Sequence, residues 1–222
     1  MLRQYLLEEI KTKYSKAHDK AQKNAALPIE QGGLGLHPNN THLDRARAMG
    51  FDVDTTYYHG TNNTPNFTKF KEGKNGIDEL GKGIYFTTHR DIAKTWASGF
   101  GNGVPNGRII PVLLNKGKVY DAHKEKYWPN PNTHKELYQA FKEHPMNADL
   151  SDSKDDQEIL QDRHSYMVKH KFNELLKIGG YHSVVNKASQ IPGQINILHP
   201  NRIRSIHAAF DPMKKDSEDI LA

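Results

Sequence analysis

The chain of 222 residues contains no cysteine, so disulfide bonds, thiolate catalysis and cysteine-ligated zinc are excluded. Hydrophobic residues make up 36% of it, and no stretch approaches the roughly 20 consecutive apolar residues of a membrane-spanning helix. The first residues lack the apolar core of a signal peptide, and Glu8 and Glu9 fall among them. We therefore expect a soluble protein that contacts no membrane.

A strong charge of one sign is also lacking. The chain has 31 basic and 26 acidic residues and a formal net charge of +5, which indicates a mixed surface rather than a continuous basic stripe. Lys69, Lys71, Lys74 and Lys82 suit either an acidic protein surface or a phosphate backbone. Charge therefore leaves a nucleic-acid partner open without favouring it.

Two common kinds of site are absent from the sequence. The thirteen histidines are scattered, His164 and His170 are six residues apart, and no His-Glu-x-x-His run occurs. We therefore expect no metal site. The run Gly32-Gly33-Leu34-Gly35 has neither the preceding strand nor the spacing of a dinucleotide-binding loop, so it is interpreted as a turn.

The N-terminal segment has the spacing of an amphipathic helix over residues 2–26. Its apolar positions are Leu2, Leu6, Ile10, Tyr14, Ala17, Ala21 and Ala25. Pro28 and Gly32-Gly33 follow as stop signals. We interpret residues 1–26 as a helical arm and residues 27–222 as one domain, since this length supports a single substantial core.

The domain alternates short strands with helices. A capping pattern at Thr41 and Asp44 begins a short helix that ends at Gly50. Strands are predicted at 56–59, 83–87, 108–114, 181–185, 194–198 and 202–208, and helices at 88–97, 134–142 and 155–177. Because strands flank a helical insertion on both sides, we predict an α+β fold with antiparallel or mixed sheets rather than a doubly wound one.

Two short motifs carry the chemistry. Tyr58-His59-Gly60-Thr61 is followed by Gly81-Lys82-Gly83-Ile84-Tyr85-Phe86, and Trp96 stands eleven residues after Tyr85. Taken singly, His59 is typical of a solvated histidine and the two aromatic residues are typical of a core. In this order, a histidine beside a glycine and a hydroxyl, then an aromatic strand, is what a pocket needs to hold a flat ring with a carboxamide.

These motifs resemble the NAD-binding core of ADP-ribosyltransferases of the diphtheria-toxin and poly(ADP-ribose) polymerase class. The chain resembles the phage and mobile-element (polyvalent protein) branch of this class over two more regions. The segments 34–41 and 45–51 are similar to the part of that branch that precedes the motifs. The segments 194–200, 203–205 and 208–212 are similar to its C-terminal strand pair. The resemblance covers roughly residues 27–212. It implies two small, mostly antiparallel sheets that form an NAD cleft. The N-terminal helix at 1–26 and much of the helical insertion over 120–175 lie outside the resemblance or match it only loosely, and we expect them in addition to these sheets.

The resemblance also implies roles for individual residues, with NAD as the co-substrate. His59 would bond a ribose hydroxyl, the Gly60 backbone would bind the carboxamide, and Thr61 would add a hydroxyl contact. Tyr85 would stack on the nicotinamide, and Trp96, where a second tyrosine is common, would cover its other side or its edge. The ring is cationic before cleavage, so each aromatic wall would stabilise it by roughly 0.5–2 kcal/mol.

The third catalytic position departs from the active pattern. The class typically has a glutamate at the start of the late strand, and the matching residue is Gln194. A glutamine keeps a hydrogen bond to the ribose but loses the charge, which is worth roughly 3 kcal/mol at about 5 Å and an effective dielectric near 20. That corresponds to about a hundredfold in rate. The catalytic set implied is therefore His59, Tyr85 and Gln194.

The expected activity is mono-ADP-ribosylation of a macromolecular acceptor, with release of nicotinamide. A catalytically weak module that binds NAD or ADP-ribose, a structural phage or effector component, and an NAD glycohydrolase toxin are the alternatives. We favour a protein acceptor over a nucleic acid and expect a monomer. The expected location is the cytoplasm of the producing cell, or of a host cell after delivery.

Overall fold

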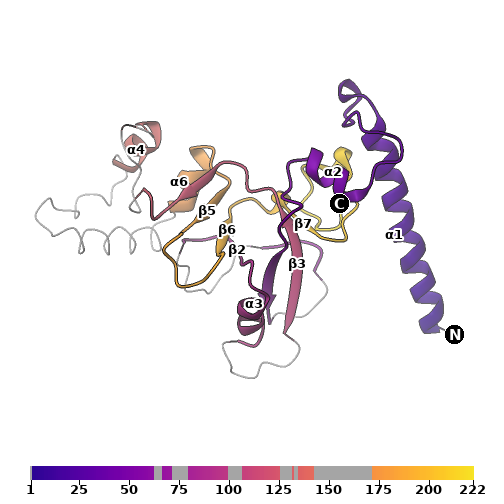
Figure 1. Ribbon diagram of the computed structural model, residues 1–222, viewed down its shortest axis with the longest axis horizontal. Helices are drawn as coiled ribbons and strands as arrows, with labels where there is room; N and C mark the ends of the chain where they lie inside the picture. The colour runs from indigo at the N-terminus through magenta and orange to yellow at the C-terminus, as the bar shows by residue number, and fades with distance from the viewer. Residues whose placement is uncertain are drawn as a thin grey trace, which may run out of the picture.

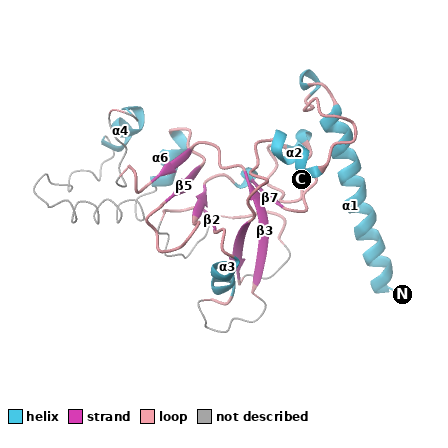
Figure 2. Ribbon diagram, in the orientation of Figure 1, coloured by secondary structure: helices cyan, strands magenta, loops and turns pink. Residues whose placement is uncertain are grey.

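A computed structural model describes residues 2–62, 67–71, 80–99, 107–125, 132, 135–142 and 172–222. Two small sheets lie side by side, with α3 at one edge and α1 at the far side of the domain (Figure 1; Figure 2). The predicted α+β class is confirmed, as are two small sheets that are mainly antiparallel. In the described part of the chain, no helix is both long and apolar enough to cross a membrane.

The first sheet has three strands in the order β1-β3-β7 and is antiparallel throughout. Strand β1 spans Tyr57–Thr61, β3 spans Arg108–Leu114 and β7 spans Ile203–Ser205. Tyr57 lies opposite Val112, which in turn lies opposite Ser205. The central strand β3 is the apolar run that the sequence predicted, and its last three residues are buried.

The second sheet has four strands in the order β2-β6-β5-β4. These are β2 (Ile84–Phe86), β6 (Ile195–Ile197), β5 (Ser183–Val185) and β4 (Val119–Asp121). Strand β4 pairs with β5 in parallel, and the other pairs are antiparallel. The sequence prediction missed β4, because three residues are too short for the alternation of apolar and polar positions to be recognised.

Five helices belong to the described residues, together with short 3-10 turns. They are α1 (Leu2–Ala26), α2 (His42–Ala48), α3 (Arg90–Ala97), α4 (Lys135–Lys142) and α6 (Phe172–Ile178). The predicted capping box of α2 is present, with Thr41 and Asp44 bonded to each other's backbone. The helix predicted at 155–177 coincides with α6 only at its end, and residues 155–171 lie outside the described part.

The main core lies between the two sheets. It brings together apolar residues of β1, β3, β7, β2 and β6 with the segment at Phe70. Phe86 and Ile84 of β2 point into this core, whereas Tyr85 packs against a second cluster on the opposite face of its sheet. This alternation follows from the two-residue period of a strand. Strand β2 therefore separates two apolar cores.

Helix α1 is attached to the domain through its C-terminal half. Ala21 and Ala25 are fully buried, the Tyr14 hydroxyl donates to the His207 carbonyl at 2.9 Å, and the Asn24 amide donates to Asp211 at 2.9 Å. Its N-terminal end lies away from the sheets (Figure 1). The helix predicted at 2–26 is thus present with the predicted bounds.

Candidate functional site: the split between β1 and β2

Strands β1 and β2 join the two sheets at a single bridge among the described residues. Tyr58 and Thr87 exchange backbone hydrogen bonds of 2.8 and 3.1 Å. On the other side of β1, Tyr58 lies opposite Pro111, which has no N–H to donate. Tyr58 therefore directs its backbone groups towards β2, and the two sheets meet at this residue.

Beyond the bridge, a side chain replaces the missing strand pairing. The Nδ1 of His59 lies 2.8 Å from the carbonyl oxygen of Tyr85. A carbonyl only accepts, so Nδ1 carries the hydrogen and Nε2 is left as an acceptor. His59 thereby holds β2 beside β1 at the point where the strands separate.

The His59 ring is enclosed by aromatic side chains. Phe70 meets it edge-on at 5.0 Å between ring centres, and Phe86 lies tilted at 5.5 Å. Burial lowers the pKa of His59, and the bond to the Tyr85 carbonyl opposes that shift in part. The imidazole is therefore neutral at pH 7, with Nε2 able to accept a hydrogen bond from a hydroxyl.

We call the place beyond the Tyr58–Thr87 bridge, where β1 and β2 no longer pair, the split. Gly60 lies there, and its backbone groups are turned away from β3. Bonded and non-bonded pairs alternate along an antiparallel ladder, so Gly60, two residues after Tyr58, also directs its N–H and C=O to the side of β2. A Cβ here would collide with the main chain of α3 at Ala93 and Ala97. Glycine is thus required for close packing of α3 on β1.

Tyr85 is fixed by its hydroxyl rather than by His59. The hydroxyl donates to the Gly81 carbonyl at 2.6 Å and accepts the Leu80 N–H at 2.8 Å. Its ring lies on the opposite face of β2 from Phe86, whereas the His59 ring lies on the Phe86 side. His59 and Tyr85 therefore meet through the Tyr85 main chain, not through a ring contact.

Two buried asparagines hold the turn before β2. The Asn196 side-chain amide donates to the carbonyls of Leu80 and Gly81 at 3.1 Å each, and the Asn173 amide donates to the carbonyls of Leu80 and Lys82. A side chain at Gly83 would collide with the Asn196 amide. The glycines of the second motif thus allow close approach of these asparagines.

Thr61 and Trp96 lie on the two elements that flank the split, β1 and α3. Thr61 ends β1 opposite Arg108. Trp96 lies in the last turn of α3, half-buried, and α3 packs on β1 through Ala93 and Ala97. The structure therefore brings the helix that carries Trp96 to the split, but it shows no contact of Trp96 with Tyr85.

Gln194 immediately precedes β6. Continuing the β2–β6 register by one residue places it opposite Thr87, in line with the bridge to Tyr58. With strands about 4.8 Å apart, two strand spacings put its backbone roughly 10 Å from that of β1. Its buried side chain accepts the Ser189 hydroxyl at 3.2 Å through Oε1, and its amide NH2 has no partner among the described residues.

The loop that leads to Gln194 is fastened to β2 and lines a hollow of about 350 Å³. The Thr87 hydroxyl donates to the Pro192 carbonyl at 2.8 Å, and a side chain at Gly193 would collide with Thr88. Lys116 and Lys187 also line the hollow, and each pairs with a carboxylate, Asp52 at 2.9 Å and Asp121 at 3.3 Å. In the described part of the chain, the side chain of Gln194 is bonded to Ser189 and that of His59 to the Tyr85 carbonyl, so the two side chains do not meet.

Sequence reasoning missed the residues that support this site. Asn173 and Asn196 hold main-chain groups of the turn before β2, and Thr87, directly after β2, holds the Pro192 carbonyl in the loop before β6. Asn196 offered a signal, because an amide between Ile195 and Ile197 in a buried strand must find hydrogen-bond partners. Thr87 and Asn173 offered none, since their partners are distant in the sequence.

Comparison with known families gave a match. Residues 55–212 match the family described as ADP-ribosyltransferase in polyvalent proteins. The chain therefore belongs to this family, whose members use NAD as substrate. Comparison with curated proteins and with solved structures gave no match.

Proposed function

We propose that the protein is a mono-ADP-ribosyltransferase that moves ADP-ribose from NAD to a macromolecular acceptor. The observation that carries this proposal is the split between β1 and β2, where the His59 imidazole is bonded to the Tyr85 carbonyl and the Gly60 N–H and C=O turn away from β3. Family membership in the ADP-ribosyltransferases supports it independently.

In this proposal the split takes the nicotinamide riboside. Gly60 offers one donor and one acceptor to the carboxamide, and the Nε2 of His59 accepts a ribose hydroxyl. Tyr85 and Trp96 provide aromatic surface for the nicotinamide, and Thr61 adds a hydroxyl contact. These groups bind and orient NAD, which is worth more to this reaction than proton transfer.

An acceptor atom then attacks C1′ of the ribose while the bond from C1′ to the nicotinamide nitrogen breaks. The electron pair of that bond neutralises the pyridinium, and nicotinamide leaves as a neutral molecule. Gln194 donates its amide hydrogen to a ribose hydroxyl but adds no negative charge beside the developing cation. Chain elongation is disfavoured, because activating a ribose hydroxyl as the next nucleophile depends most on a carboxylate.

We favour a protein acceptor over a nucleic acid, and a cytoplasmic monomer. Incubation with labelled NAD and cell lysate tests the proposal against its alternatives. Label on macromolecules supports the transferase. Free ADP-ribose alone supports an NAD glycohydrolase toxin, and intact NAD supports a module that only binds NAD or ADP-ribose.

A further inference from the structure

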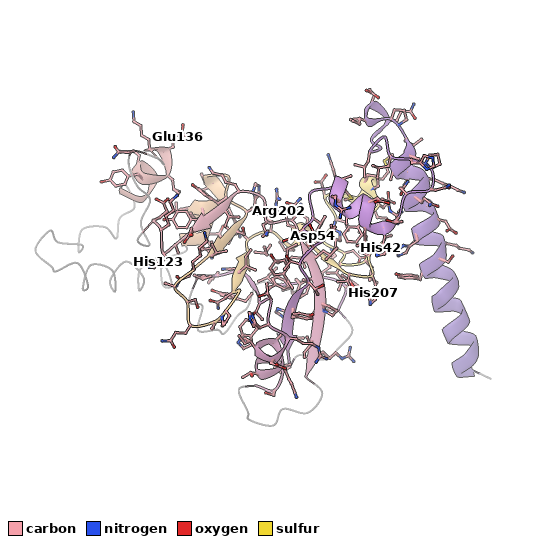
Figure 3. The ribbon with its side chains drawn as sticks, in the orientation of Figure 1. His42, Asp54, His123, Glu136, Arg202 and His207 are labelled. Carbon is pink, nitrogen blue, oxygen red and sulfur yellow. The ribbon has the colours of Figure 1, made fainter. Side chains whose placement is uncertain are left out.

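A cluster of basic side chains lies at the end of the second sheet that is remote from Gln194. We call it the basic edge; it consists of Lys118, His182, His199 and Arg202. Gln194 precedes β6 and His199 follows it closely, so the strand separates the two places. Arg202 lies at the edge of the domain opposite α3 (Figure 3).

The members of the basic edge are held together by direct contacts. The ring centres of His182 and His199 are 5.5 Å apart, and His182 accepts the Lys118 backbone N–H at 3.0 Å through Nδ1. His182 therefore carries its hydrogen on Nε2, as a donor. The Lys118 ammonium lies 4.1 Å from the centre of the Tyr181 ring. The basic groups are thus gathered by the fold and not spread along a flexible segment.

Gly117 lies against this cluster, and its lack of a side chain leaves room for His182 and Arg202. Its φ is +52°, which an L side chain rarely adopts, and a Cβ would lie 2.6 Å from His182 Nδ1 and 2.7 Å from Arg202 Nη1. Arg202 donates to the Asn115 side-chain oxygen at 2.7 Å through Nη1. Its Nε and Nη2 have no bonding partner in the part of the chain that the structure describes.

Within the described residues, Lys118, His182 and Arg202 form no ion pair with a carboxylate. The Lys118 ammonium donates instead to the Gly179 carbonyl at 3.2 Å. Burial is the largest cause of the lowered pKa of His182. The remaining causes are the positive charges of Arg202, His199 and Lys118. Such a set of like charges is relieved by a bound anion.

We propose that the basic edge binds the phosphate backbone of a nucleic acid. Cationic and imidazole donors gathered in one place match successive phosphate oxygens, and the net charge of +5 favours the approach of a polyanion. An anionic membrane is the weaker match. Among the residues that the structure describes, only Val119 and Ile178 expose large apolar side chains beside the cluster, which is far less than an inserting amphipathic face.

This inference goes beyond the proposed function and does not depend on it. Gln194 and the basic edge lie at opposite ends of the short strand β6, so they are two separate places on the domain. The proposed role of the basic edge is to localise the domain on a nucleic acid, whichever acceptor the split serves.

The test is fluorescence anisotropy with a labelled 20-nucleotide single strand, as DNA and as RNA, and with the corresponding duplex. Lys118→Glu reverses one exposed charge, and Lys214→Glu is the matched control at an exposed lysine on η4 (Pro212–Lys214). We expect Lys118→Glu to weaken binding about tenfold and to reduce the salt slope between 50 and 200 mM by about one, whereas Lys214→Glu changes the affinity less than about twofold.

Arg202→Gln provides a second variant, checked for folding by thermal melting because Arg202 also holds Asn115. We expect weaker nucleic-acid binding in each folded variant and unchanged NAD turnover in Lys118→Glu. Equal affinity of wild type, Lys118→Glu and Lys214→Glu would overturn the proposal. So would binding to phosphatidylserine vesicles that depends on Lys118 while no nucleic acid binds.

Discussion

The two halves of the candidate site are built in different ways. On one side, His59 is bonded to the main chain of β2 and enclosed by Phe70 and Phe86, so its position is part of the core. On the other side, Gln194 ends a loop that is held by Thr87 and the Ser189 hydroxyl. We call the His59 side, which would orient NAD, the rigid half of the site. The Gln194 side, which would stabilise charge, is the loop half; it is held by a few polar bonds, so a different side chain at residue 194 should be tolerated.

The largest effect is expected in the rigid half. His59→Ala and Tyr85→Ala each remove a group that would position the nicotinamide riboside, and a loss of orientation costs about a hundredfold or more in turnover. Calorimetry with NAD and a turnover assay on folded protein measure this. His123→Ala is the matched control, because His123 is exposed and outside the split.

Tyr85→Phe separates ring from hydroxyl in the same half. It keeps the aromatic face but leaves the Leu80 N–H without its partner, which costs about 1–3 kcal/mol of stability. Unchanged NAD affinity and turnover in both His59→Ala and Tyr85→Ala would show that the split is not the cofactor site.

The loop half should respond in the opposite direction. Gln194→Glu places a negative charge beside the developing cation and keeps an oxygen that can accept the Ser189 hydroxyl, so NAD hydrolysis should rise by about one to two orders of magnitude. Gln194→Ala should instead lose the ribose hydrogen bond. Equal hydrolysis by wild type and both variants, all folded and saturated with NAD, would mean that residue 194 does not face the reacting carbon.

The same contrast explains what the sequence allowed us to predict. The motif at 58–61, the strand at 108–114 and the helix at 2–26 are visible because local pattern and fold agree. The strand predicted at 194–198 is present as β6 over Ile195–Ile197, with Gln194 directly before its first residue. Local pattern was enough for the helix and for the strand at 108–114, and the family resemblance pointed to the motif at 58–61.

What could not be predicted depends on contacts between distant segments. His59 bonds the Tyr85 carbonyl 26 residues away, and Asn173 bonds the Leu80 carbonyl 93 residues away. The need for glycine at Gly60 also comes from α3, which follows it by some thirty positions in the chain. No periodicity carries such information, and the three residues of β4 are too few for their alternation of apolar and polar positions to be recognised.

Trp96 tests where the rigid half ends, because it lies on α3, which packs on β1 through Ala93 and Ala97. If the indole covers the nicotinamide, NAD should quench its fluorescence saturably, and Trp96→Phe should remove most of the response. Trp128 contributes a background signal and lies outside the described residues. Quenching that persists in Trp96→Phe and disappears in Trp128→Phe would place the pocket elsewhere.

The smallest expected effect concerns the pH dependence of stability. Burial lowers the pKa of His59 in the folded protein below its ordinary value of 6.5, so the unfolded chain binds more protons as the pH decreases through that value. The free energy of unfolding should therefore be highest above pH 6.5 and should decrease below it. Because His18, His42 and His182 also have lowered pKa values, only the difference from a variant isolates His59.

His59→Gln is the suitable variant, since its amide can still donate to the Tyr85 carbonyl while it does not titrate. Urea unfolding from pH 8 to pH 5 should give a shallower decrease for His59→Gln than for wild type. The two slopes should differ by at most one proton, about 1.4 kcal/mol per pH unit. Parallel curves would show that the folded protein accepts a proton on His59 without cost. In that case the imidazole would not be a neutral acceptor held in the core, and the rigid half of the site would be as adaptable as the loop that carries Gln194.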